Sequence, residues 1–248
     1  PEVGERLTQV AGLKRLLLEL GSNSSVIYDD MDVPDAVIQK TVRGAFAQAG
    51  QVCISVQKLY IPKRRHDPII PRLIEASKKL KVGDPLDPAT DVGPMISDTA
   101  ADRAEEWILE AANHGAELLT PWRRDGRLIH PTLLLNADES LRVCAKEAFA
   151  PVLVVNEVED FDEALARVNA SQFGLQLGVF TNRLDYVLQV AQSAEVGGVL
   201  INEIPAFRVD LMPYGGMKRS GLGREGPRYA VEEFTELKLV SLNPLPNA

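Results

Sequence analysis

The sequence is organised around the stretch Ala45-Phe-Ala-Gln-Ala-Gly-Gln-Val-Cys-Ile-Ser55, which leaves a predicted helix, passes a glycine corner and presents Cys53. Backbone N–H groups that converge after such a corner lower the pKa of a thiol and can hold an oxyanion. Cys53 is therefore a candidate nucleophile. The alternative is a half-buried cysteine that packs as a small apolar side chain, which is the commoner role of this residue type.

The segments on either side of this stretch have different periodicities. Before it, Asp30 and Pro34 are typical of a helix N-terminus, and small or apolar residues recur at every fourth position until Gly50. After it, residues 57–61 alternate as a strand does, and Pro62 ends the pattern. The stretch with the cysteine therefore connects a helix to a strand.

The rest of the chain continues this alternation. Short apolar runs predict a buried strand at Leu16–Leu18 and further strands at 26–28, 116–119, 132–135, 152–155, 173–180 and 199–201. Amphipathic runs predict helices at 2–11, 67–81, 97–115, 160–170 and 184–194, with Ser97 as the N-cap of the third. Strands that alternate with helices of about ten residues indicate βαβ units. We therefore predict an α/β fold with a mostly parallel, twisted sheet and flanking helices.

The composition excludes several classes of partner. The 248 residues carry a formal net charge of −8, and no basic stripe is present, so nucleic acid is not expected to bind. No apolar run reaches the roughly 18 residues needed to cross a bilayer, and no signal-peptide pattern is present. Two cysteines do not make a disulfide framework. We therefore expect no membrane contact and a cytoplasmic location.

No metal site is predicted from the histidines. His66, His114 and His130 are far apart, and none lies at metal-ligand spacing from a cysteine. A histidine brought to Cys53 by folding would instead make a cysteine hydrolase or acyltransferase, and the sequence leaves this alternative open. The other cysteine, Cys144, is expected to be inert.

The last part of the chain is dense in glycine, in Tyr214-Gly-Gly-Met-Lys-Arg-Ser-Gly-Leu-Gly-Arg-Glu-Gly226. Clustered glycines indicate tight turns or a close backbone approach, and the spacing of a phosphate-binding P-loop is missing. We therefore expect a structural loop near the active site. Residues 234–242 then alternate with period two, which predicts an edge strand that is exposed unless another chain covers it.

Together these segments resemble the aldehyde dehydrogenase superfamily. The resemblance is carried, in family order, by Leu18-Glu-Leu-Gly21, Gly50-Gln-Val-Cys53, Glu147-Ala-Phe-Ala-Pro151, Phe173-Gly-Leu-Gln-Leu-Gly-Val-Phe-Thr181 and Pro213-Tyr-Gly-Gly-Met-Lys-Arg-Ser-Gly-Leu-Gly-Arg-Glu225. Each segment alone is a weak signal, and their common order over nearly the whole chain makes the resemblance specific. Ser22 and Ala150 depart from it, because the family usually has glycine at both positions.

The resemblance implies a role for each matching residue. Cys53 matches the nucleophile and Glu19 the general base, whereas Glu147 and Phe149 match the residues that hold the ribose and nicotinamide ring of NAD or NADP. The implied reaction oxidises an aldehyde to a carboxylate through a thiohemiacetal and a thioester, which water activated by the base then hydrolyses. For both glutamates the alternative is an ion pair with a neighbouring basic residue. For Phe149 the alternative is core packing.

Two further segments resemble one branch of this family. Gly21-Ser-Asn and Phe207-Arg-Val-Asp are similar to enzymes that act on small anionic or hydroxylated aldehydes, such as lactaldehyde or phosphonate aldehydes. The resemblance implies that Arg208 contacts an anionic group of the substrate. The alternative is a salt bridge between Arg208 and Asp210, or a simple surface charge.

The resemblance also implies how the chain is divided. Residues 1–18 match the end of a cofactor-binding domain that is otherwise absent, residues 19–234 match the catalytic domain, and residues 235–248 match a C-terminal oligomerisation strand and tail. The chain starts without methionine inside a predicted helix, so we expect a fragment without dehydrogenase activity of its own. The family implies a small aldehyde substrate and a homodimer or homotetramer. A non-catalytic oligomerisation module is the competing interpretation.

Overall fold

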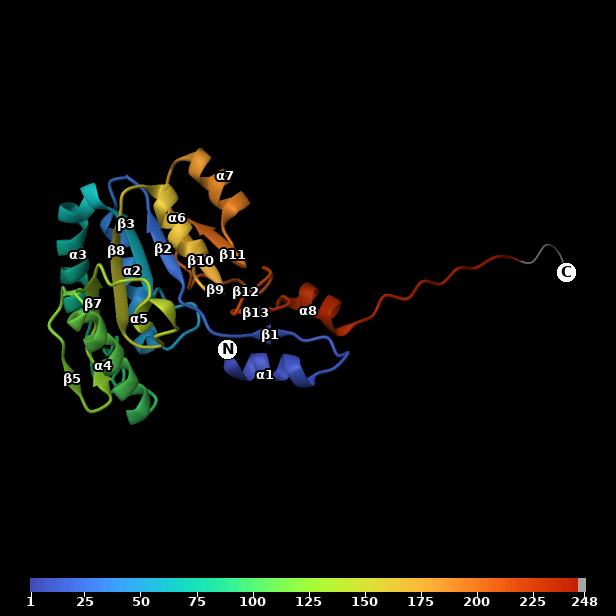
Figure 1. Cartoon of the computed structure of the whole chain (residues 1–248), viewed down its shortest axis with the longest axis horizontal. Coiled ribbons are helices and arrows are strands. Elements are labelled where there is room, and N and C mark those ends of the chain that lie inside the picture. The colour runs from blue at the N-terminus through green and yellow to red at the C-terminus, as the bar shows by residue number, and fades with distance from the viewer. Residues whose placement is uncertain (245–248) are drawn as a thin grey trace.

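The computed structural model describes residues 1–244, and a seven-stranded sheet lies at its centre (Figure 1). The strand order is β11 (Gly198–Ile201), β10 (Gln176–Phe180), β2 (Ser25–Tyr28), β3 (Lys58–Pro62), β8 (Val152–Val158), β7 (Thr132–Leu135) and β4 (Glu117–Leu118). Each neighbouring pair is parallel except β4 and β7, which are antiparallel. The predicted α/β fold with a mostly parallel sheet is confirmed.

Both faces of the sheet are buried, which explains why its strands are apolar throughout. Along β2, Val26 and Tyr28 pack into one apolar cluster and Ile27 packs into another on the opposite face. β3 divides in the same way, because Leu59 belongs to the first cluster and Tyr60 to the second. Successive side chains of a strand point to opposite faces, so helices must cover both sides.

Helices α2, α3 and α4 supply the first cluster, and α6 and α7 supply the second (Figure 1). The helical segments of the core are α2 (Asp35–Phe46), η1 (Ala47–Gly50), η2 (Lys63–Arg65), α3 (His66–Lys78), α4 (Asp98–Asn113), α5 (Arg142–Ala145), α6 (Phe161–Asn169) and α7 (Leu184–Ser193). The predicted cap is confirmed, since Ser97 Oγ accepts a hydrogen bond of 3.1 Å from the backbone N–H of Ala100. Among residues 1–244, no helix is both long and apolar enough to pass through a bilayer.

The remaining elements are short strands and the helices of the two chain ends, of which α1, β1 and α8 lie to one side of the central sheet (Figure 1). These elements are α1 (Glu2–Val10), β1 (Leu18–Glu19), β5 (Arg124–Asp125), β6 (Leu128–Ile129), β9 (Phe173–Gly174), β12 (Met217–Lys218), β13 (Gly221–Leu222) and α8 (Pro227–Phe234). Pairs form between β1 and β13, between β9 and β12, and between β5 and β6. The glycine-rich segment therefore folds back on two distant parts of the chain.

Two predicted strands at the margins of the chain differ from the structure. The buried strand expected at Leu16–Leu18 is wrong, because only Leu18 and Glu19 form a strand, and that strand is partly exposed at the margin of the molecule. The tail also forms no strand between residues 235 and 244 and is exposed there, while residues 245–248 lie outside the described part. Leu16, Leu17 and residues 235–244 pair with no strand among residues 1–244, whereas Leu18 pairs with Leu222 of β13 in a two-stranded ladder outside the central sheet.

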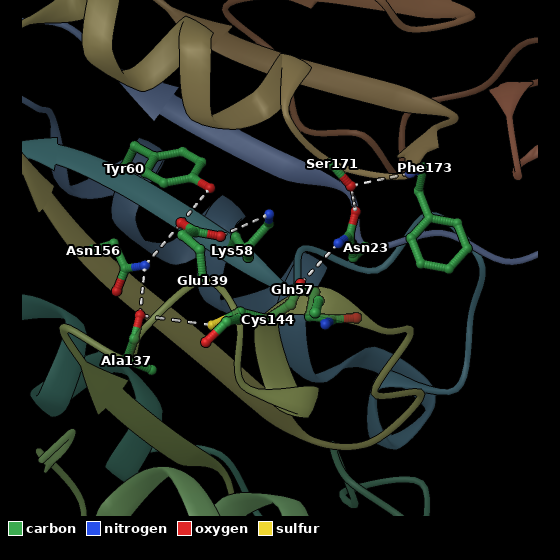
Figure 2. Close-up of polar contacts among 12 residues, drawn as sticks. Asn23, Gln57, Lys58, Tyr60, Ala137, Glu139, Cys144, Asn156, Ser171 and Phe173 are labelled. Carbon is green, nitrogen blue, oxygen red and sulfur yellow. Dashed lines mark hydrogen bonds and ion pairs between the residues drawn. The ribbon is translucent and has the colours of Figure 1, made fainter. Parts of the chain in front are cut away.

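Beneath α6 the sheet carries a buried polar network, in which the side-chain oxygen of Asn156 is left without a partner among residues 1–244 (Figure 2). Lys58 is only 2% exposed, and its Nζ lies 3.3 Å from a carboxylate oxygen of Glu139. Tyr60 donates a 2.8 Å hydrogen bond to the same carboxylate, and Asn156 donates one of 3.0 Å. Cys144 lies nearby, and burial raises the pKa of its thiol to about 12, so it stays protonated at neutral pH. This agrees with the expectation that Cys144 is inert.

Candidate active site

The position of Cys53 is set by a left-handed turn that follows α2. The helix gives way to η1, in which Gln48, Ala49 and Gly50 all have positive φ, so the helix stops one turn earlier than predicted. Gly50 has a φ of 69°, and a Cβ there would lie 2.1 Å from the carbonyl oxygen of Ala150. Gln48 and Ala49 share the positive φ, but only glycine leaves room for the carbonyl oxygen at this distance. The turn therefore presses the cysteine loop against the segment around residue 150.

Glu19 reaches the same place from β1, whose antiparallel pairing with β13 fixes its direction. One carboxylate oxygen of Glu19 lies 3.5 Å from the Sγ atom of Cys53. The alternative ion pairs do not form within residues 1–244, because Lys14 makes none and Arg15 pairs with Glu236 instead. The sulfur and the carboxylate thus share one site, as the sequence predicts.

Tyr214 is the third group at the sulfur, and the sequence analysis did not single it out. Its hydroxyl oxygen lies 3.2 Å from the Sγ atom of Cys53. The residue is 1% exposed and makes a two-way backbone hydrogen-bond pair with Glu225. The only signal available in the sequence was an aromatic residue with a hydroxyl group at the start of the glycine-rich segment.

The surroundings of Cys53 raise the pKa of its thiol. Burial is the largest cause and the negative charge of Glu19 adds to it, whereas the hydrogen bond with Tyr214 lowers the pKa. The prediction that converging N–H groups lower this pKa is therefore wrong for this chain. The physical reason is that burial and a neighbouring carboxylate both disfavour the thiolate.

Glu147 and Phe149 lie in the segment that Gly50 contacts. Glu147 is partly buried, accepts a 2.8 Å hydrogen bond from the backbone N–H of Ser22, and makes no ion pair with Lys146. Burial raises the pKa of its carboxyl group. Phe149 has a φ of 48° and stays partly exposed, so it is outside the apolar core. Both alternatives proposed from the sequence therefore fail for this segment.

Gln57, on the same loop as Cys53, holds that segment in place through three hydrogen bonds. Its amide nitrogen donates to the carbonyl oxygens of Val143 and Lys146 at 2.7 and 2.8 Å, and its amide oxygen accepts from the N–H of Ala148 at 2.9 Å. Because the amide group of this buried glutamine is hydrogen-bonded at both its nitrogen and its oxygen, it fixes the cysteine loop to the segment that carries Glu147 and Phe149. The sequence analysis missed it because nothing in the local pattern reports a contact some ninety positions away.

Arg208 packs on the ring of Tyr214, whose hydroxyl group contacts Cys53. Its guanidinium group is 4.1 Å from the ring centroid of Tyr214 and 3.0 Å from a carboxylate oxygen of Glu225. Arg208 therefore forms a salt bridge with Glu225, and the salt bridge with Asp210 that the sequence analysis named as an alternative does not form. Arg208 remains partly exposed, with 37% of its side chain accessible.

Histidine takes no part in the site within residues 1–244. His66 bonds to Glu157, His114 bonds to a backbone carbonyl, and neither contacts the sulfur; His130 does not contact it either. The histidine that the cysteine hydrolase alternative requires beside Cys53 is therefore missing among these residues. The same residues contain no group of three or more histidine, cysteine or acidic side chains arranged to hold a metal ion.

Comparison with known proteins gives a consistent result. A sequence model of the aldehyde dehydrogenase family matches residues 1–240. The 3-sulfolactaldehyde dehydrogenase of Priestia aryabhattai is 43% identical over 247 residues, which cover 98% of this chain and 51% of that protein. The lactaldehyde dehydrogenase of Methanococcus aeolicus is 43% identical over 244 residues, which cover 98% of this chain and 52% of that protein.

Solved structures agree with the sequence matches. Aldehyde dehydrogenase 21 from Physcomitrella patens, in complex with succinate, superposes with a TM-score of 0.91 at 40% identity, over 95% of this chain and 49% of that one. The glyceraldehyde-3-phosphate dehydrogenase of Methanocaldococcus jannaschii, complexed with NADP, gives 0.90 at 39% identity, over 96% and 52%. The chain thus spans about half the length of the relatives it matches. On this match over residues 1–240, the chain belongs to the aldehyde dehydrogenase family.

Proposed function

We propose that the chain is the catalytic half of an NAD(P)-dependent aldehyde dehydrogenase that oxidises an aldehyde to a carboxylate. One observation carries this proposal: a partly buried cysteine sulfur contacts a glutamate carboxylate at 3.5 Å. A nucleophile beside a general base is the pair that acyl transfer through a thioester requires. Membership of the family supports the same chemistry.

In the proposed reaction the thiolate of Cys53 attacks the aldehyde carbon and forms a thiohemiacetal. The N–H of Cys53 makes no hydrogen bond within residues 1–244, so it can donate to the resulting oxyanion. Loss of hydride converts the adduct to a thioester. Glu19 then removes a proton from water, and the hydroxide displaces the thiolate and releases the carboxylic acid.

NAD or NADP would accept the hydride, and Glu147 and Phe149 are the residues proposed to hold it. The fit is supported by the position of the Glu147 carboxylate. One of its oxygens accepts the hydrogen bond from Ser22. The other oxygen lies so close to Gly21 that a Cβ at that position would be only 2.8 Å from it. That second oxygen makes no hydrogen bond within residues 1–244 and is an acceptor suited to a ribose hydroxyl. Phe149, partly exposed, offers a flat apolar surface to an aromatic ring.

The proposed substrate is a small aldehyde that carries a negative charge or a hydroxyl group. Arg208 supports this, because its cation lies against the ring whose hydroxyl contacts Cys53. Relatives named for 3-sulfolactaldehyde, aspartate semialdehyde and lactaldehyde match at 41 to 44% identity and fit that chemical class.

The test is hydrolysis of an activated ester such as p-nitrophenyl acetate, which needs the thiol and the base but no cofactor. Cys53→Ala should abolish turnover, and Cys144→Ala should retain it. Equal turnover in the two variants would refute the assignment of the nucleophile. Aldehyde oxidation should be absent from the chain by itself and should appear when the gene is extended upstream to include a nucleotide-binding domain.

A second proposal concerns the division of the chain and its assembly, and it does not require the non-catalytic module that was the competing interpretation of the sequence. We propose that residues 1–18 belong to the cofactor domain, that residues 19–234 form the catalytic domain, and that residues 235–248 pair with a second copy in a homodimer or homotetramer. Leu237 and Leu239 support the last point, being 105% and 94% exposed with no cover in the chain itself. Sedimentation of the intact chain against one that ends at Glu233 tests it, and equal mass in both would exclude the tail from assembly. A reducing cytoplasm suits the proposal, because both cysteines are free.

A further inference from the structure

We propose that Tyr214 is a further catalytic residue, whose hydroxyl donates a hydrogen bond to the Cys53 thiolate and holds the sulfur ready for attack. The contact is direct, because the two atoms lie 3.2 Å apart. The inference deepens the proposed function, since it names a group that acts on the same sulfur. It also stands on its own geometry, because a thiolate has this neighbour whatever electrophile approaches.

The tyrosine is fixed from several sides. Its backbone N–H and carbonyl both bond to Glu225, at 3.1 and 2.6 Å. Arg208 stacks on its ring at 4.1 Å and is itself held by Glu225. The next residue, Gly215, has a φ of 157°, and a Cβ there would lie 2.6 Å from the carbonyl oxygen of Gly223. The clustered glycines therefore allow the loop to place one hydroxyl at the sulfur.

Of the two side chains that contact the sulfur, only the tyrosine can donate to a thiolate. The carboxylate of Glu19 is an acceptor, so it repels the thiolate and interacts favourably only with the thiol. Burial raises the pKa of Tyr214, and the nearby Cys53 and Glu19 raise it further, so the phenol keeps its proton at neutral pH. When Cys53 loses its proton to a base in solution, the hydroxyl bonds to the charged sulfur without giving up its own proton.

This arrangement predicts a change in the shape of the pH profile of the thiol. A hydrogen bond to a charged group is worth about a tenfold change in the thiolate population. Tyr214→Phe removes that bond and keeps the ring. The thiolate fraction at pH 7 should fall about tenfold, while each remaining thiolate becomes about threefold more nucleophilic. The net rate of alkylation should therefore be about threefold lower at pH 7 and about threefold higher on the alkaline plateau.

The experiment measures iodoacetamide alkylation of the 248-residue chain from pH 6 to 11. The matched control is Tyr186→Phe, which removes a hydroxyl bonded to Arg183 at 2.8 Å and distant from the sulfur. Cys53→Ser gives the background from Cys144. Crossing profiles for Tyr214→Phe, with an unchanged control, support the inference. A profile that is unchanged, or that is lowered by one factor at every pH, overturns it.

The outcome is separable from that of the proposed dehydrogenase. Alkylation needs neither aldehyde nor cofactor, so crossing profiles in a protein without ester or aldehyde turnover would support the role of Tyr214 at the sulfur while removing the proposed reaction. Normal ester turnover, with alkylation profiles that are the same for the parent chain and Tyr214→Phe, would support the proposed reaction and overturn the role of Tyr214. A Tyr214→Phe, Glu19→Gln double variant adds a check, because the two changes act on the thiolate in opposite directions and should largely cancel at pH 7.

Discussion

Replacing Glu19 by glutamine should separate two effects of one carboxylate. Its charge, 3.5 Å from Cys53 Sγ, raises the pKa of the thiol and so opposes formation of the nucleophile. Its basicity is proposed to activate water once the thioester has formed. Glutamine keeps the size and polarity of the side chain and removes both charge and basicity. The first chemical step should therefore become faster in Glu19→Gln, and the last step slower.

The magnitude of the first effect follows from the distance. Two unit charges 3.5 Å apart repel by about 1.2 kcal/mol in a water-like dielectric. Removing that repulsion corresponds to about a sevenfold larger thiolate population below the pKa of Cys53. Lower nucleophilicity of the better-stabilised thiolate reduces the gain in rate to about threefold. Because the sulfur is partly buried, the water-like value is a lower bound on the repulsion.

The assay has two parts, iodoacetamide alkylation at pH 7 and steady-state hydrolysis of p-nitrophenyl acetate. Glu19→Gln should be alkylated about threefold faster than the parent chain and should turn over ester about 100-fold more slowly, with an initial burst of one product equivalent. Slower alkylation would refute the reasoning, because it would show that Glu19 serves the thiol as a proton acceptor. Unchanged ester turnover would remove Glu19 from the hydrolytic step.

Three predictions concern the scaffold and are checked by the free energy of unfolding in urea. Gly50→Ala should lower the free energy of unfolding by about 2 kcal/mol or more relative to the control Gly12→Ala. Both glycines have positive φ, but of the two only Gly50 faces a backbone oxygen, 2.1 Å from the added Cβ. Equal losses in the two variants would contradict the close approach. Glu139→Ala should lower the free energy of unfolding by about 2 to 4 kcal/mol, because the charge of Lys58, which is 2% exposed, is left without a counter-ion. A decrease of less than about 0.5 kcal/mol would contradict that account. Gln57→Leu should lower the free energy of unfolding by about 2 kcal/mol and weaken cofactor binding in the extended protein, because the segment from Val143 to Ala148 loses its hydrogen bonds to Gln57.

Local patterns predicted most of the sheet and its helices. Alternation placed Ile27 and Tyr60 in strands, and the helix that Ser97 caps begins where its hydroxyl can satisfy a free N–H. The same reasoning failed at Leu16–Leu18, because an apolar run forms a buried strand only where it can pair with a strand of the central sheet and pack under a helix. It also failed at the tail, whose period-two pattern has no partner strand within this chain.

By itself the sequence determined the α/β class with its mostly parallel sheet, and its resemblance to the aldehyde dehydrogenase family predicted that Cys53 and Glu19 act together. These follow from short-range periodicity and from motifs in a fixed order. Only the tertiary structure decided that Tyr214 touches the sulfur and that the pKa of Cys53 is raised. The pKa of a buried group depends on burial and on charges within a few ångströms, and folding alone sets those distances between residues up to 161 positions apart.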